Sequence, residues 1–187
     1  MKRRTEYCGL ISEKLVGQTV TLDGWVAKRR DHGGVIFIDL RDREGIMQVV
    51  FNPARNQEAF EIAEKLRSEY VIQVTGEVAF RGEGLENPNL KTGKFELLVD
   101  EVEVFSQAKT SPIYIDDEQK PSEELRLKYR YLDIRRRPVL ENLRLRHKAT
   151  RSIREYLDGE GYIDVETPIL AKSTPEGARD YLVPSRV

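Results

Sequence analysis

The sequence predicts an α+β protein whose first part is a five-stranded β-barrel with one helix, followed by a hinge and then by one further helix and strand. Three observations lead to this prediction. Five segments are rich in β-formers or alternate apolar with polar residues, as strands with a buried face do. A single segment with helical spacing separates the third strand from the fourth. After residue 108 the sequence becomes rich in proline and polar residues, and then in arginine.

The first three strands are predicted from closely spaced segments. Residues 19–30 place Val20, Leu22 and Trp25 among polar residues, and Gly24 suits a bulge or a sharp bend. Residues 35–42 and 45–52 are rich in β-branched and other apolar residues, and a short turn separates them. These segments predict three consecutive strands.

The predicted helix covers residues 53–69. Phe60, Ala63 and Leu66 follow one another at three-residue steps, and Pro53 suits the start of a helix. Residues 70–80 and 95–108 then supply two more strands on either side of a loop rich in Gly, Asn and Pro. Five strands with one helix between the third and the fourth are typical of the OB-fold, whose strand 2–3 face commonly binds single-stranded nucleic acid.

The remaining sequence predicts a hinge over residues 109–138 and a second unit over residues 139–187. A helix is expected over about 140–158, with an apolar stripe that includes Leu143, Ile153 and Leu157, and a strand over 163–170 interrupted by Pro168. About 50 residues are too few to bury a core of their own. The stripe is therefore expected to pair with another chain, to dock on the barrel or to fray.

Composition excludes several classes of protein. No apolar segment reaches the roughly 20 residues of a membrane span, and the N-terminus lacks the apolar segment of a secretory signal. A single cysteine, Cys8, cannot form an internal disulfide, and two distant histidines make a metal site improbable, so a cytoplasmic protein without a bound metal is expected. The net charge is −1, but residues 121–154 hold 11 Lys and Arg against four Asp and Glu. Such a segment is either a basic binding surface or a solvated helix.

The segment RRDHGGVIFIDLRDREGIMQVVF, residues 29–51, holds the groups that RNA recognition needs. Phe37 lies in the second strand, Arg30, Asp31 and His32 precede it, and Gln48 lies in the third strand. A ring can stack on a base, and a guanidinium or an amide can read its edge. The alternative is that Phe37 belongs to the core, and the apolar pattern alone leaves both open.

Three segments together resemble one family. They are residues 29–51, LRLKYRYLDIRRRP and the final GYIDVETPILAKSTPEGARDYLVPSRV, and they resemble in order the bacterial-type aspartyl-tRNA synthetases of class II. The resemblance implies that residues 1–108 are an anticodon-binding OB-fold domain and that 109–138 are the hinge. It also implies that 139–187 are the start of the catalytic domain.

The resemblance implies roles for individual residues. Phe37 would stack on the central anticodon base, and Glu96 would help to read that base. The other side chains expected at the anticodon are Arg30, Asp31, His32, Gln48 and Arg81. His32 stands where strict family members often carry Leu, which favours acceptance of tRNA(Asn) beside tRNA(Asp). A loop histidine without a role is the alternative.

In the second unit, Pro168 would be the proline of motif 1, which forms a homodimer interface, and Glu176 would pair with the ammonium group of aspartate. FRGE at 80–83 satisfies the F-R-x-E pattern of motif 2, but it precedes motif 1 and is interpreted as part of the barrel.

The implied reaction is the ATP- and Mg²⁺-dependent attachment of aspartate to tRNA. Motifs 2 and 3, which hold the ATP phosphates in this family, are expected beyond residue 187. The resemblance therefore implies that this chain carries no complete catalytic site and needs no cofactor itself. The alternative is a stand-alone OB-fold module that binds RNA without catalysis.

Overall fold

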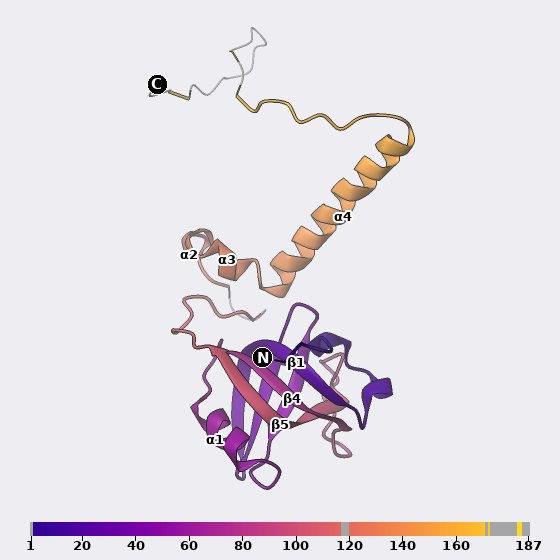
Figure 1. Cartoon of the computed structure of the whole chain (residues 1–187). Helices are drawn as coiled ribbons and strands as arrows, with labels where there is room; N and C mark the ends of the chain where they lie inside the picture. The colour runs from indigo at the N-terminus through magenta and orange to yellow at the C-terminus, as the bar shows by residue number, and fades with distance from the viewer. Residues whose placement is uncertain (1, 117–119, 171, 173–182, 185–187) are drawn as a thin grey trace. The chain divides into compact units, whose positions relative to one another are not determined.

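The computed structural model describes residues 2–116, 120–170, 172 and 183–184. It divides into two compact units, Met1–Arg136 and Arg137–Val187, which are described separately. Figure 1 shows the barrel of the first unit, with its strands in indigo to pink, and the long helix of the second unit in orange.

The first unit contains the strands and the helix that the sequence predicts. The strands are β1 (Thr19–His32), β2 (Val35–Arg41), β3 (Ile46–Phe51), β4 (Val71–Phe80) and β5 (Phe95–Ser106). Helix α1 (Gln57–Lys65) lies between β3 and β4, and two short 3₁₀ turns, η1 (Cys8–Leu10) and η2 (Glu13–Leu15), precede β1. The predicted order of strands and helix is confirmed.

The five strands close into a barrel in the order β1-β2-β3-β5-β4. The parallel pairing of β3 with β5 closes the barrel and places Gln48 beside Glu96. The predicted irregularity in β1 lies between Val26 and Lys28 rather than at Gly24. Gly24 instead permits a close strand approach, since a Cβ there would lie 2.7 Å from the carbonyl oxygen of Arg41.

Alternation along each strand fills the core. In β2, Ile36, Ile38 and Leu40 are fully buried, whereas the residues between them are partly exposed. Helix α1 covers one end of the core with the buried Ala59 and Ala63. The start of this helix is fixed by Asn56, whose Oδ1 accepts a hydrogen bond of 3.0 Å from the backbone N–H of Ala59.

The hinge segment packs with the barrel as part of the same unit. Its helices are α2 (Glu123–Lys128) and α3 (Arg130–Asp133). They surround the buried carboxylate of Asp133 with three guanidinium groups, from Arg126, Arg130 and Arg136, at 2.9–3.2 Å. Burial raises the pKa of Asp133, but Arg126 and Arg136 outweigh it and hold this pKa below its usual value. Part of the positive charge of residues 121–154 thus pairs with a buried carboxylate of the same chain.

Two contacts fasten the hinge to the end of the barrel. The Arg135 guanidinium stacks over the Trp25 ring, 4.0 Å from its centroid. Arg41 of β2 donates from Nη1 to the carbonyl oxygen of Ile115 at 3.4 Å, next to the buried Ile113. The end of β2 that is remote from Phe37 therefore meets the hinge.

The second unit contains the long helix α4 (Arg137–Gly159), close to the predicted 140–158. No residue of α4 is buried, and Leu143, Ile153 and Leu157 of its apolar stripe are exposed. Residues 163–170, expected as a strand, are neither helix nor strand. Within the described part of this unit there is no neighbouring strand to supply backbone hydrogen bonds, which explains the difference.

Pro168 is described and exposed, whereas Glu176 lies outside the described residues. None of the helices in the described ranges is both long and apolar enough to cross a membrane.

Candidate nucleic-acid interface

The outer face of β2 carries Phe37, Asp39 and Arg41, because these residues alternate with the buried Ile36, Ile38 and Leu40. Phe37 is partly exposed, so its ring is not part of the core. The structure thereby decides between the two interpretations that the sequence left open. The ring is placed on the surface formed by β1, β2 and β3, where a base could stack on it.

A chain of polar contacts crosses this surface beside Phe37. Arg30 Nη2 of β1 donates to Asp39 Oδ1 at 2.6 Å and to Gln48 Oε1 at 3.3 Å. Gln48 Nε2 in turn donates to Glu96 Oε2 of β5 at 2.9 Å. The strand register explains this chain, because Asp39 pairs with Gln48 and Gln48 with Glu96. We call Arg30, Asp39, Gln48 and Glu96 the polar row.

Arg81 follows β4 and lies within electrostatic reach of the polar row. Its backbone N–H donates to the carbonyl oxygen of Lys94, and its Nε donates to that of Phe95 at 3.0 Å. Burial lowers the pKa of the Arg81 guanidinium, and the charges of Glu96 and Asp39 partly offset this effect. The side chain stays cationic, since an arginine in a protein does not lose its proton.

Two donors at this surface are buried without a protein acceptor. Arg30 Nε and Arg81 Nη2 have no hydrogen-bond partner among the residues that the structure describes. An unpaired buried donor costs about 1–3 kcal/mol. An acceptor atom on a bound nucleic-acid base or phosphate would remove this cost, so these donors suit a ligand with exposed oxygen or nitrogen acceptors.

His32 stands at the edge of the same surface. Gly33 and Gly34 form the two-residue loop between β1 and β2, with φ of 61° and 82°. Tight hairpin loops need positive φ at such positions, and glycine adopts it without strain. The loop keeps the His32 ring edge-on to Phe37, with their centroids 6.4 Å apart.

Asp31 is not brought to the polar row. Successive side chains of a strand point to opposite faces, and Asp31 lies 3.8 Å from Arg29 Nη2. Arg29 Nε donates to the carbonyl oxygen of Ala63 in α1, so this pair belongs to the helix end of the barrel. Of the side chains expected at the anticodon, Asp31 therefore lies apart from the others.

Sequence reasoning missed Asp39. The available signal was its position two residues after Phe37 in a strand, which places both side chains on the same face.

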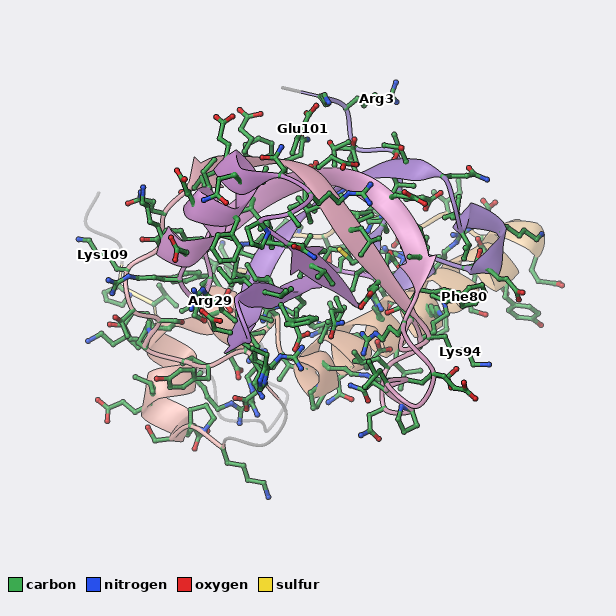
Figure 2. The ribbon with its side chains drawn as sticks, turned by 90° about the horizontal axis from the view of Figure 1, so that it is seen from below. Arg3, Arg29, Phe80, Lys94, Glu101 and Lys109 are labelled. Atoms are coloured by element: carbon green, nitrogen blue, oxygen red, sulfur yellow. The ribbon has the colours of Figure 1, made fainter. Side chains whose placement is uncertain are left out.

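Phe80 ends β4 as expected for a barrel residue, and its half-exposed ring packs against Phe95 with centroids 5.5 Å apart. Figure 2 shows Phe80 close to Lys94, whereas Arg29 lies on the other side of the barrel.

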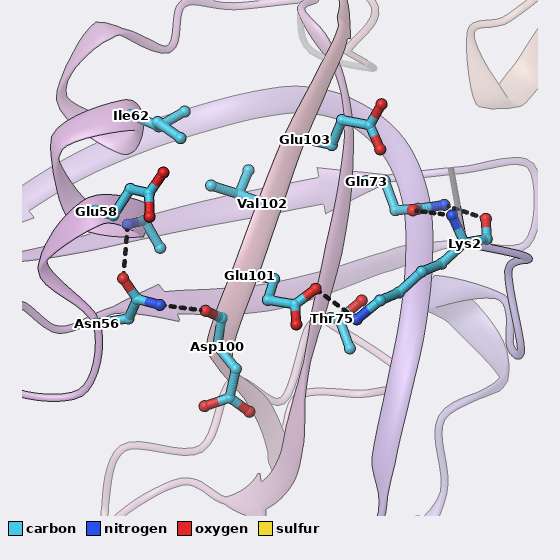
Figure 3. Close-up of a pocket in the computed structure, with 11 residues that line it drawn as sticks. Lys2, Asn56, Glu58, Ile62, Gln73, Thr75, Asp100, Glu101, Val102 and Glu103 are labelled. Carbon is cyan, nitrogen blue, oxygen red and sulfur yellow. Dashed lines mark hydrogen bonds and ion pairs between the residues drawn. The ribbon is translucent and has the colours of Figure 1, made fainter.

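A separate hollow lies between α1, β4, β5 and the N-terminal segment (Figure 3). Its lining includes four acidic residues, Glu58, Asp100, Glu101 and Glu103, and one basic residue, Lys2, whose Nζ pairs with Glu101 at 2.5 Å. Such a surface repels phosphate. Among the described residues, moreover, no group of three or more His, Cys, Asp or Glu could hold a metal ion.

Comparison with known proteins matches both parts of the chain. Residues 20–105 match the family model "OB-fold nucleic acid binding domain", and residues 122–187 match "tRNA synthetases class II (D, K and N)". Among curated proteins, the aspartate–tRNA ligase of Enterococcus faecalis is 57% identical over 187 residues, which is 100% of this chain and 32% of the relative. The aspartate–tRNA(Asp/Asn) ligase of a Geobacillus species is 60% identical over 184 residues, which is 98% of this chain and 31% of the relative.

Solved structures agree with these matches. The asparaginyl-tRNA synthetase of Pyrococcus horikoshii is 31% identical with a TM-score of 0.76, over 91% of this chain and 39% of that one. The aspartyl-tRNA synthetase of Entamoeba histolytica shares the fold, with a TM-score of 0.79 at 20% identity, over 90% of this chain and 40% of that one.

An OB-fold followed in the same chain by the opening of a synthetase domain defines a class II aminoacyl-tRNA synthetase. The chain belongs to the bacterial aspartate–tRNA ligase family within that class and corresponds to its N-terminal portion. It spans about a third of the length of the curated relatives that it matches.

Proposed function

We propose that this chain supplies the anticodon-binding barrel and the hinge of an aspartate–tRNA ligase. The complete enzyme attaches L-aspartate to tRNA(Asp) at the expense of ATP. The observation that carries the proposal is the outward-facing ring of Phe37 beside two buried, unpartnered arginine donors. Unstacked anticodon bases offer both a face for stacking and edge atoms that accept hydrogen bonds.

Each group on the surface has a role in this proposal. Phe37 stacks on the central anticodon base, and Gln48 and Glu96 present an amide and a carboxylate to base edges. Arg30 and Arg81 direct their unpartnered N–H groups at acceptors of the anticodon loop. Asp31 lies on another face and has at most an indirect role.

The test is the affinity of the chain for a tRNA(Asp) transcript, with Phe37→Ala against Phe37→Tyr as the matched control. Stacking contributes about 1–3 kcal/mol per base, so Phe37→Ala is expected to weaken binding about ten- to a hundredfold, whereas the tyrosine variant keeps the ring and most of the affinity. Binding should also weaken with added salt. Unchanged affinity in a folded Phe37→Ala protein would remove the anticodon assignment.

The amino-acid and nucleotide sites belong to the rest of the enzyme in this proposal. ATP and Mg²⁺ bind there, and Glu176 approaches the aspartate ammonium from this chain. We assign no Mg²⁺ ligand to this chain. The chain alone is expected to show no aspartate-dependent pyrophosphate exchange, and measurable exchange would contradict this.

The exposed stripe of α4 supports a homodimer of the complete enzyme, formed around Pro168 and this helix. We assign the enzyme to the cytoplasm, where tRNA is charged. The match of residues 122–187 to a synthetase domain gives no support to a stand-alone RNA-binding module.

We also propose that the enzyme charges tRNA(Asn) as well as tRNA(Asp). His32 borders the Phe37 ring, where it can meet an anticodon base, and the Geobacillus relative is named for both tRNAs. His32→Leu in the complete enzyme is expected to favour tRNA(Asp) over tRNA(Asn) when the two are charged in parallel. The same strict preference for tRNA(Asp) in both proteins would exclude the idea.

A further inference from the structure

Asp39 occupies an unusual position for an acidic residue. It lies in β2 two residues from Phe37, and its partly exposed carboxylate faces the surface on which RNA is proposed to bind. A negative charge on such a surface opposes the phosphates of the ligand. We therefore expect the Asp39 carboxylate to offset this repulsion by a favourable contact in the free protein or in the complex.

The contacts of Asp39 connect it to the proposed reader, Gln48. Arg30 Nη2 lies 2.6 Å from Asp39 Oδ1 but 3.3 Å from Gln48 Oε1. The shorter contact joins two opposite charges and is the stronger of the two. Asp39 thus determines where the Arg30 guanidinium lies, and the guanidinium then faces the oxygen of the Gln48 amide.

Only one orientation of the Gln48 amide satisfies these neighbours. Its Oε1 accepts from Arg30, and its Nε2 donates to Glu96 at 2.9 Å. An amide has a donor end and an acceptor end. Turning it by half a rotation would set its NH₂ group against the Arg30 cation and its oxygen against the Glu96 carboxylate, and both contacts would become repulsive.

We infer that Asp39 is a positioning residue for anticodon recognition: it holds Arg30, and through Arg30 it fixes the donor and acceptor pattern that Gln48 presents to one anticodon base. The inference rests on the proposed function and extends it to a residue that touches no RNA itself. Without the Asp39 carboxylate, Arg30 can leave Gln48, and the amide can then present either end to a base. Discrimination between bases therefore falls more than affinity does.

The experiment measures dissociation constants of the chain for a tRNA(Asp) transcript and for three transcripts, each changed at one anticodon base. Asp39→Asn keeps the shape of the side chain and removes its charge. We expect the penalty for a wrong base to shrink about three- to tenfold at one position, the factor that one lost hydrogen bond produces. It should be the position at which Gln48→Ala also loses discrimination.

A double variant tests whether Asp39 acts through Gln48. In the Gln48→Ala background, Asp39→Asn is expected to cause no further loss of discrimination, because residues in one network are not additive. Asp100→Asn is the matched control. It disrupts another aspartate–arginine contact of 2.6 Å, from Arg55 Nε, in a different part of the barrel, and it should leave every ratio unchanged.

The outcomes separate the two ideas. If Phe37→Ala weakens binding but Asp39→Asn alters affinity for all four RNAs equally, the positioning role is refuted and the proposed function stands. If Phe37→Ala has no effect, the proposed function itself fails.

The side-chain NH₂ signals of Gln48 in a nitrogen–proton NMR spectrum give a readout that needs no RNA. They should move towards the free-amide position in Asp39→Asn and stay in place in Asp100→Asn. Unmoved signals would overturn the inference.

Discussion

Glu69 joins the barrel to the hinge in a strained backbone conformation. Its φ is 65°, and it is the one residue other than glycine with a positive φ in the described part of the chain. Both carboxylate oxygens accept from Arg41 Nη2, at 2.9 and 2.8 Å, and Arg135 Nη1 lies 3.7 Å away. The informative perturbation is a pair of substitutions, Glu69→Ala and Glu69→Gly, because they separate the ion pair from the backbone strain.

The magnitudes follow from the contacts. The side chains of Arg41 and Glu69 are only 14% and 13% exposed, so solvent screens their contact little. Because one donor nitrogen serves both oxygens, they count as a single charged hydrogen bond of about 1.5–3 kcal/mol. A left-handed conformation costs a residue with a Cβ roughly 1–2 kcal/mol, and glycine avoids this cost. Glycine also makes the unfolded chain more flexible, which lowers the stability of the fold by about 0.4–1 kcal/mol.

Glu69→Ala is therefore expected to lower the free energy of unfolding by about 2 kcal/mol, and Glu69→Gly by only about 1 kcal/mol. Urea denaturation followed by tryptophan fluorescence measures both. Trp25 is the single tryptophan of the chain, and it lies under the Arg135 guanidinium beside this contact. A glycine variant less stable than the alanine variant would refute the strain argument, and two variants as stable as the parent would show that the ion pair contributes nothing.

Two further predictions concern ionisable groups. The lowered pKa of Asp133 stabilises the fold above about pH 4, and this stability is lost as the pH falls through that pKa. Asp133→Asn should therefore lower the free energy of unfolding by about 1–3 kcal/mol at neutral pH and by less in acid. Urea curves of both proteins between acid and neutral pH measure the difference, and a constant difference would contradict the assignment. Burial and, to a smaller extent, the Asp42 charge raise the pKa of the Cys8 thiol well above its ordinary value, and the thiolate is the reactive form. A thiol reagent at pH 8 should thus label the native protein much more slowly than the unfolded chain, and similar rates in both would show that Cys8 is accessible.

Local pattern was sufficient for the order of elements in the barrel. Alternating strands and one segment of helical spacing depend on nearby residues, and the structure has them in the predicted order. The side on which Phe37 lies was a different matter. Its neighbours Ile36 and Ile38 are also apolar, so alternation alone could not tell the core face from the outer face. Closure of the barrel decides which face of β2 is buried, and Phe37 lies on the other face.

The contacts of the polar row depend on pairing between strands. Asp39 lies nine positions from Arg30, and their contact follows from the β1–β2 register, in which Arg30 pairs with Phe37 and Lys28 with Asp39. The expected strand over 163–170 differs for a related reason, since a strand forms only where another strand accepts and donates its hydrogen bonds.

Closure of the barrel and assembly of the recognition surface are the same event. Gln48 and Glu96 meet where β3 runs parallel to β5, although 48 positions separate them in the chain. During synthesis, a chain that has emerged only as far as β3 holds Phe37, Asp39 and Gln48 but lacks the Glu96 carboxylate to which the amide donates. Under the proposed function, selectivity for an anticodon begins only when β5 has been added.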